Sequence, residues 1–177
     1  MPCGERGHRA DLPPAPNAQR SPASGRHGSR RVDDAGLRAG LVVRRARPEE
    51  LDACADLYVR VLRETFTWID PARHRREDFL RAAREEEVYA AFDRGRLIGV
   101  AALYAPQNFL HSLYVTDRGR GVGRALLDHI AERLDGPMSL KCQAANRAAQ
   151  AFYEREGFLA TDAGEDNGVA WIRYVRE

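Results

Sequence analysis

The stretch "YVTDRGRGVGRALL", residues 114–127, lies between an apolar strand-like run and the start of an amphipathic helical pattern. Three glycines and three arginines alternate at this junction. A helix N-terminus presents unpaired N–H groups and the positive end of its dipole, and glycine removes the Cβ that would keep an anion away. Arginine adds forked donors that suit phosphate. The stretch predicts a phosphate or pyrophosphate seat over residues 119–124; the alternative is a glycine-rich turn without a ligand.

Two familiar phosphate-binding loops do not fit this stretch. A dinucleotide fingerprint needs a third glycine, but Arg124 or Leu126 stands at that position in the two possible frames. A P-loop needs Gly-Lys followed by Ser or Thr, and the stretch contains no lysine. The phosphate ligand is therefore of another kind.

The rest of the chain divides into helices and strands by hydrophobic spacing and turn residues. Strands are predicted over 41–47, 88–92, 96–104, 108–115, 138–143, 158–163 and 169–175. Helices are predicted over 48–64, 73–86 and 122–134, and from an N-cap at Asn146 to about residue 156. Hairpins beside crossover helices indicate an α/β fold with a mixed sheet covered by helices.

Residues 1–39 differ from the domain predicted over residues 40–177. They are rich in Pro, Ser, Gly, Ala and Arg and have little to bury, so we expect a disordered tail. A targeting or nucleic-acid arm and an over-long translation start are the alternatives. The whole chain has a net charge of +2, which gives no general argument for a nucleic-acid or membrane partner.

The three cysteines, Cys3, Cys54 and Cys142, form no CxxC pair and support neither a disulfide framework nor a zinc site. No apolar run approaches the roughly 20 residues of a spanning helix, and the N-terminus lacks the apolar middle of a secretory signal. We therefore expect a cytoplasmic protein without a metal.

Two motifs together resemble the GNAT superfamily of acetyl-coenzyme A-dependent N-acetyltransferases. Arg118-x-x-Gly121-x-Gly123 resembles the superfamily's Q/R-x-x-G-x-G/A motif, and "NRAAQAFYEREGF", residues 146–158, resembles N-x-x-A-x-x-F-Y-x-x-x-G-F. Their separation also matches, and the resemblance extends from residue 41 to about 176. It implies a GNAT-type mixed central sheet flanked by helices and splayed at the cofactor site.

The resemblance assigns acetyl-coenzyme A, as cosubstrate, to a set of residues around the glycine-arginine turn. The strand before the turn would pair with the pantetheine arm, and backbone N–H groups of the turn would hold the pyrophosphate. Asn146 would contact the pantetheine arm, although a simple N-cap is an equal alternative. The residues so assigned are Leu113, Tyr114, Val115, Arg118, Gly119, Arg120, Gly121, Val122, Gly123, Arg124 and Asn146.

Two residues are candidates for the chemistry. Tyr153 matches the tyrosine that the superfamily uses as general acid toward the leaving thiolate; the alternative is a core aromatic. His111 lies where relatives often have a glutamate, and histidine ordinarily titrates near pH 6.5, so a general base and a structural histidine are equal alternatives. Strand alternation predicts that His111 shares a face with Leu113 and Val115.

The implied activity is direct transfer of an acetyl group to a primary amine on a small molecule or a peptide. The N–H of Val115 would polarise the thioester carbonyl. Phe66 and Trp68 are candidates for the acceptor wall, although a loop anchored by two aromatics is the favoured alternative, and residues 85–87 are expected to form a solvated acidic run. A silent coenzyme A-binding sensor and an RNA-associated protein are the rivals, and a homodimer is possible.

Overall fold

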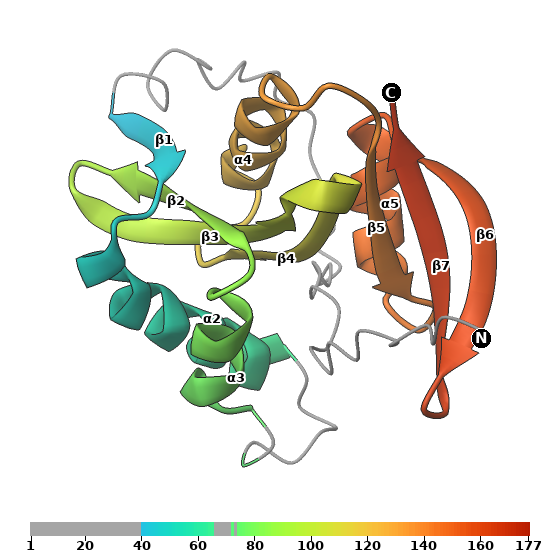
Figure 1. Cartoon of the computed structure of the whole chain (residues 1–177), viewed down its shortest axis with the longest axis horizontal. Coiled ribbons are helices and arrows are strands. Elements are labelled where there is room, and N and C mark those ends of the chain that lie inside the picture. The colour runs from blue at the N-terminus through green and yellow to red at the C-terminus, as the bar shows by residue number, and fades with distance from the viewer. Residues whose placement is uncertain (1–39, 66–71, 73) are drawn as a thin grey trace, which may run out of the picture.

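One seven-stranded sheet organises the computed structural model, which describes residues 40–65, 72 and 74–177 (Figure 1). Its order is β1-β2-β3-β4-β5-β7-β6, and β4–β5 is the parallel pair. The strands are β1 Leu41–Arg45, β2 Glu87–Asp93, β3 Arg96–Tyr104, β4 Phe109–Val115, β5 Met138–Gln143, β6 Leu159–Asp166 and β7 Val169–Arg176. The helices are α2 Leu51–Thr65, α3 Arg76–Ala82, α4 Val122–Ala131 and α5 Arg147–Arg155, with short 3-10 turns at Pro48–Glu50 and Ala105–Gln107. The expected tail and the expected wall residues Phe66 and Trp68 lie outside the described residues.

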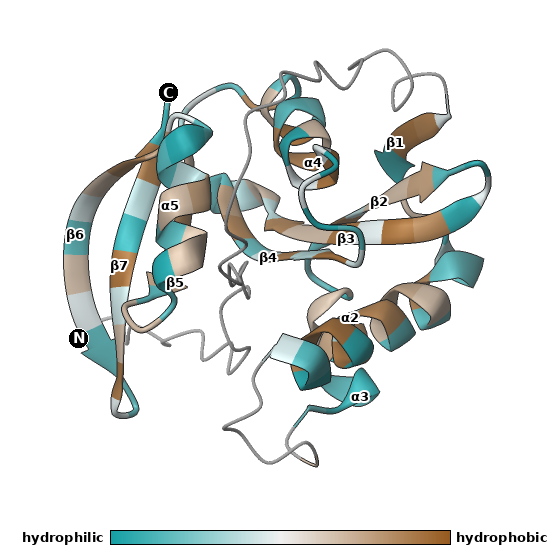
Figure 2. Cartoon of the chain, turned by 180° about the vertical axis from the view of Figure 1, so that it is seen from behind, coloured by the Kyte–Doolittle hydropathy of each residue, from teal (hydrophilic) through white to brown (hydrophobic). Residues whose placement is uncertain are grey.

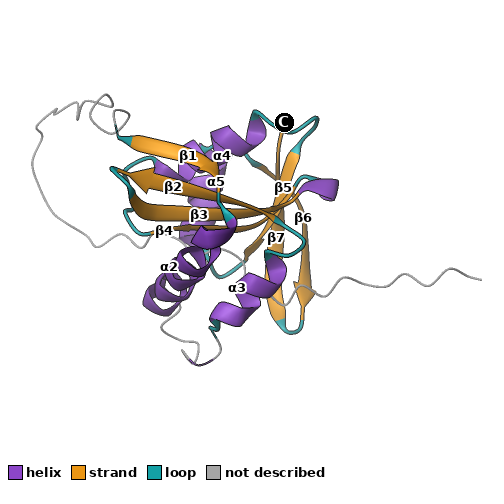
Figure 3. Ribbon diagram, turned by 60° about the vertical axis from the view of Figure 1, so that its left-hand side comes forward, coloured by secondary structure: helices purple, strands orange, loops and turns teal. Residues whose placement is uncertain are grey.

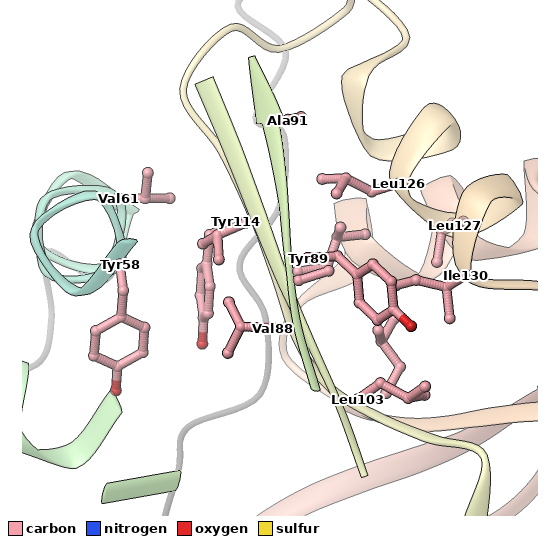
Figure 4. Packing of buried hydrophobic residues seen from close by; sticks show 14 of the residues in the cluster. Tyr58, Val61, Val88, Tyr89, Ala91, Leu103, Tyr114, Leu126, Leu127 and Ile130 are labelled. Atoms are coloured by element: carbon pink, nitrogen blue, oxygen red, sulfur yellow. The ribbon is translucent and has the colours of Figure 1, made fainter. Parts of the chain in front are cut away.

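Helices cover both faces of the sheet. Tyr114 of β4 points toward α2, where its ring meets Tyr58 at 5.1 Å between centroids. Figure 4 shows Tyr89 on the opposite side of the strands, beside Leu126, Leu127 and Ile130 of α4. We call these the α2 face and the α4 face. Figure 2 shows that β3, which lies between the two faces, is largely hydrophobic (brown), whereas much of the edge strand β6 is intermediate or hydrophilic (pale or teal).

The helix α4 lies close to both β3 and α5 because glycines stand at the two contacts. A Cβ on Gly99 of β3 would come within 2.9 Å of Val122 Cγ1. A Cβ on Gly123 of α4 would lie 3.0 Å from Cζ of Phe152 in α5. The two helices therefore share one face of the sheet, with α4 over the first half and α5 beside the second.

The parallel pair β4–β5 separates soon after it begins. Only Phe109 with Ser139 and Leu110 with Leu140 are paired, although both strands continue. Figure 3 shows the result: β1–β4 run across the view, and β5–β7 stand nearly upright. This confirms the predicted mixed sheet, flanked by helices and splayed after residue 110.

A β-bulge marks the same point of β4. Ser112 pairs with Ala102 of β3, but the next pair is Leu110 with Leu103, so His111 is the extra residue. A bulge bends its strand and increases the local twist, and it re-aims the side chain at the bulge. Strand separation and bulge thus coincide at His111.

Two predicted helices are shorter in the structure. The helix predicted over 73–86 is α3, Arg76–Ala82, and the chain then turns so that Glu86 enters the protein instead of continuing a solvated run. The helix predicted over 122–134 ends at Ala131. No helix of the described residues is long and apolar enough to span a membrane.

Candidate functional site

The turn before α4, residues 119–124, adopts the backbone that its glycines allow; we call it the phosphate turn. Gly119 and Gly121 have φ angles of 75° and 74°, in the left-handed region that favours glycine, and Gly121 is the N-cap of α4. A Cβ built on either residue would meet no atom within 4 Å. The turn therefore leaves space beside its backbone, at the positive end of the α4 dipole, where an anion can approach.

Gly123 has a different environment from the other two glycines. It is buried in the first turn of α4, and a Cβ there would press on the ring of Phe152. Its small size therefore serves the packing of α4 against α5. The sequence motif combines two glycines for the turn with one for helix packing.

The arginines of the turn have partners within the protein. Arg118 Nη2 donates to Thr65 Oγ1 at 2.6 Å, at the end of α2. Arg120 Nη1 lies 2.9 Å from Asp117 Oδ2, and Arg124 Nε lies 3.4 Å from Asp128 Oδ2. These carboxylates offset part of the positive charge, so an anion at this turn would be held chiefly by backbone N–H groups and the helix dipole.

The strand before the turn has an open edge toward β5. Leu113 and Tyr114 are buried, and Val115 is half-buried, yet β4 has no ladder with β5 after Leu110. Among the described strands, none forms a ladder with this side of β4 after Leu110, an arrangement that suits an extended ligand. The assignment of Leu113, Tyr114 and Val115 to the pantetheine arm stays a prediction.

Tyr153 lies in α5 as a buried side chain with 3 % exposure. Its ring meets Phe158 at 5.5 Å and Tyr174 at 6.2 Å between centroids. Burial raises the pKa of the Tyr153 phenol well above its ordinary value, and the neighbouring Cys142 adds to the rise. Tyr153 therefore carries its proton throughout the physiological pH range, as a proton donor must.

The N-terminus of α5 shows the predicted cap. Asn146 Oδ1 accepts a hydrogen bond from the backbone N–H of Ala149 at 3.2 Å. The N-cap role of Asn146 is therefore confirmed, and a contact with the pantetheine arm stays a prediction.

His111 lies in a cluster that the sequence did not reveal. Its Nδ1 is hydrogen-bonded to Oε1 of Glu86, and its ring stacks on Tyr104 and meets Phe109 edge-on, with centroids 6.1 Å and 4.7 Å away. The His111 side chain is 23 % exposed, whereas that of Glu86 is 4 % exposed. We call Glu86, Tyr104, Phe109 and His111 the acceptor corner.

The prediction that His111 shares a face of the sheet with Leu113 and Val115 is wrong. A Cβ built on Gly99 would point toward Val122 of α4 and would lie 3.3 Å from Cγ1 of Val115. Val115 is therefore on the α4 face. His111 instead contacts Tyr104, which shares the α2 face with Ala102 and Val100 by strand alternation. The physical reason is the bulge, which adds one residue to β4 and breaks the alternation between His111 and Leu113.

Tyr114 links the acceptor corner to Tyr153. Burial raises the pKa of the Tyr114 phenol well above its ordinary value, and electrostatic interactions with Tyr58, Tyr153 and Glu86 act in the same direction. Tyr153 from α5 and Glu86 from the α2 face are therefore both near the Tyr114 side chain. The strands β4 and β5 separate between the two candidate catalytic residues, His111 and Tyr153.

The region 51–158, more than half of the chain, matches the family model described as acetyltransferase (GNAT) family. The chain belongs to the GNAT acetyltransferase family. This confirms the resemblance on which the site residues were assigned. A search of the curated proteins finds no match.

Solved GNAT structures have the same fold at low sequence identity. A GCN5-related N-acetyltransferase of Rhodopseudomonas palustris is 18 % identical, with a TM-score of 0.64 over 77 % of this chain and 95 % of that one. The PaiA N-acetyltransferase of Thermoplasma acidophilum, solved with coenzyme A, is 18 % identical, with 0.60 over 75 % and 97 %. The ribosomal-protein-S18-alanine N-acetyltransferase of Escherichia coli is 18 % identical, with 0.63 over 77 % and 92 %. At these identities the likeness shows the fold.

The residues present fit a coenzyme A thioester. A phosphate group fits the open backbone at Gly119 and Gly121, and an arm that carries amides fits the unpaired edge of β4. Within the described ranges, no group of three or more His, Cys, Asp or Glu residues could hold a metal ion.

Proposed function

We propose that this GNAT protein transfers the acetyl group of acetyl-coenzyme A directly to a primary amine. The observation that carries the proposal is the separation of β4 and β5 after Leu110, with Tyr153 on the α5 side and His111 on the α2 face. This arrangement supports a thioester entering between the strands, with an acid and a base on its two sides.

The phosphate turn and β4 bind the cosubstrate. Residues 119–124 hold the pyrophosphate through backbone N–H groups, while Leu113, Tyr114 and Val115 pair with the pantetheine arm. The N–H of Val115 donates to the thioester carbonyl oxygen, where negative charge develops during attack. Asn146, the N-cap of α5, contacts the arm from the β5 side.

His111 and Tyr153, the two candidate catalytic residues, carry out one proton transfer each. His111 takes a proton from the acceptor amine, because only the neutral amine has a lone pair for attack. Tyr153 gives a proton to the departing thiolate, and burial keeps that proton in place until the thiolate forms.

The acceptor is an amine on a small molecule or on a peptide. Among proteins of the same fold, one acts on an alanine of a ribosomal protein, as its name states. A screen should therefore include both small amines and peptide N-termini. A cytoplasmic location, a homodimer and a disordered tail over residues 1–39 remain predictions.

The test is acetyl-coenzyme A consumption across that panel, followed by Tyr153→Phe with the best acceptor. The variant removes one proton donor and little volume, so we expect turnover to fall by roughly 10²–10⁴-fold with cofactor affinity retained. Tyr174→Phe is the matched control, because Tyr174 is a buried tyrosine of the same aromatic cluster. Binding of acetyl-coenzyme A without turnover on any amine would indicate a sensor, and full turnover of Tyr153→Phe would reduce this tyrosine to packing.

A further inference from the structure

Glu86 is a buried carboxylate whose position demands a physical reason. One of its oxygens is hydrogen-bonded to His111 Nδ1, and the other, Oε2, is buried with no hydrogen-bond partner among the residues that the structure describes. A buried acceptor without a partner destabilises the fold, because its hydration is lost and nothing replaces it. Such groups are rare in native proteins, and a catalytic role is one of their explanations.

Two features of the sheet bring Glu86 to His111. The next residue, Glu87, accepts a hydrogen bond from Tyr89 at 2.7 Å and pairs with Arg45 at 3.0 Å, on the α4 face of β2. Alternation then directs Glu86 to the α2 face, where the bulge in β4 also directs His111. The pair depends on both features.

We propose that Glu86 is a positioning residue that fixes the proton of neutral His111 on Nδ1. This inference rests on the proposed function. A carboxylate can only accept a hydrogen bond, and neutral imidazole carries one N–H, so Nδ1 must be the donor. The other nitrogen, Nε2, then has the lone pair that a base requires, and no described residue is bonded to it.

The surroundings support a fixed ring. Tyr104 lies nearly parallel to the imidazole at 20°, and Phe109 meets it at 68°, so the ring plane is held from two sides. When Nε2 accepts a proton from the amine, the imidazolium that forms is beside a carboxylate. The charge-assisted hydrogen bond stabilises that imidazolium, as an aspartate does in serine protease triads.

The first test reads the proton position directly. Nitrogen-15 NMR of the histidine rings, with the His111 signals assigned from His111→Ala, distinguishes an Nδ1–H ring from an Nε2–H ring. We expect His111 to be Nδ1–H in the wild type and to lose that preference in Glu86→Leu. Glu85→Gln is the control, because it removes the same charge from the exposed neighbour. An Nε2–H ring in the wild type, or an unchanged ring in Glu86→Leu, would overturn the proposal.

The second test is kinetic. We expect Glu86→Gln and Glu86→Leu to lower kcat by at least about ten-fold while KM for acetyl-coenzyme A stays the same. In a His111→Ala background, Glu86→Leu should lower kcat no further, because Glu86 acts through His111. An equal loss in both backgrounds would contradict positioning. If no amine is turned over, the proposed function fails, and the NMR result still decides the role of Glu86. If Glu86→Leu does not fold, Glu86→Gln replaces it in both tests.

Discussion

The phosphate turn and the acceptor corner are built in opposite ways. The turn is one continuous segment, exposed over residues 119–121, and it offers backbone N–H groups at the start of α4. The corner collects side chains from the segment before β2, the end of β3 and the start of β4, and its carboxylate is buried. The contrast teaches that the proposed cofactor seat depends on local backbone conformation, whereas the proposed chemistry depends on side chains that only the complete sheet brings together.

The largest expected effect is on turnover, through the corner. His111→Ala should lower kcat by about 10²–10⁴-fold, because the base is lost, and should leave acetyl-coenzyme A affinity unchanged. Steady-state kinetics with a saturating acceptor measures both. His129→Ala, on α4, is the control and should behave as the wild type. Wild-type kcat in His111→Ala would show that another group or a water takes the proton.

The next effect separates binding from backbone strain in the turn. Acetyl-coenzyme A at about 100 times its dissociation constant should stabilise the wild type by roughly 2.7 kcal/mol, and Gly121→Val should abolish this because a side chain occupies the space of the anion. Gly95→Val in the β2–β3 turn is a matched control, since Gly95 has a φ of 80° and open space around it. Thermal shifts with and without ligand measure the difference. Equal ligand shifts in both variants would place the anion elsewhere.

A smaller effect tests whether Gly123 belongs to packing. Gly123→Ala should lower the free energy of unfolding by up to about 2 kcal/mol, because the cost of a Cβ at 3.0 Å from the Phe152 ring exceeds the roughly 1 kcal/mol that alanine gains over glycine in a helix. Adding Phe152→Leu should restore part of that loss by making room. Urea unfolding of the two single variants and the double variant measures the coupling. Additive losses would mean that the two residues do not conflict.

The smallest effect comes from a salt bridge outside both regions and calibrates the stability measurements. Arg44 bonds Glu50 and, with the backbone N–H of Arg47, holds the pKa of Glu50 at about 2, below its ordinary 4.5. A depressed carboxylate pKa stabilises the fold above pH 4.5, and this stabilisation is lost as the pH falls through about 2. Glu50→Gln should cost about 1 kcal/mol at pH 7 and nothing near pH 2. Unfolding at both pH values checks this, with Glu49→Gln as control; a loss that does not depend on pH would contradict it.

The sequence predicted the elements whose signals are local. The strand β3 and the helix α5 lie where spacing and caps indicated, and the glycines at 119 and 121 have the backbone that their type suggested. The family resemblance predicted a mixed sheet flanked by helices and its splay, and the structure confirms both. Each of these features depends on neighbours within a few residues or on a motif of known spacing.

The acceptor corner could not be predicted in the same way. A bulge is defined by the partner strand, so nothing in "FLHSLYV", residues 109–115, announces that His111 is the extra residue. The burial of Glu86 is likewise a tertiary property of a residue inside an acidic run, and its partner is 25 positions away. The partner of Arg118 was missed for the same reason, since Thr65 lies 53 positions away in the sequence.

The early separation of β4 and β5 also bears on self-association. It gives the sheet an edge in its interior, and unpaired edges ordinarily recruit strands from other molecules and lead to aggregation. A flat foreign sheet cannot lie along this edge, because β5–β7 stand across its path and α4 and α5 cover one face. One of the two outer edges, β6, has no such shelter and instead carries a bulge and the acidic residues Asp162, Glu165 and Asp166, which disfavour edge-to-edge pairing. The interior edge and this outer edge are thus protected against foreign strands in different ways: the first by neighbouring elements, and the second by its own charges and bend.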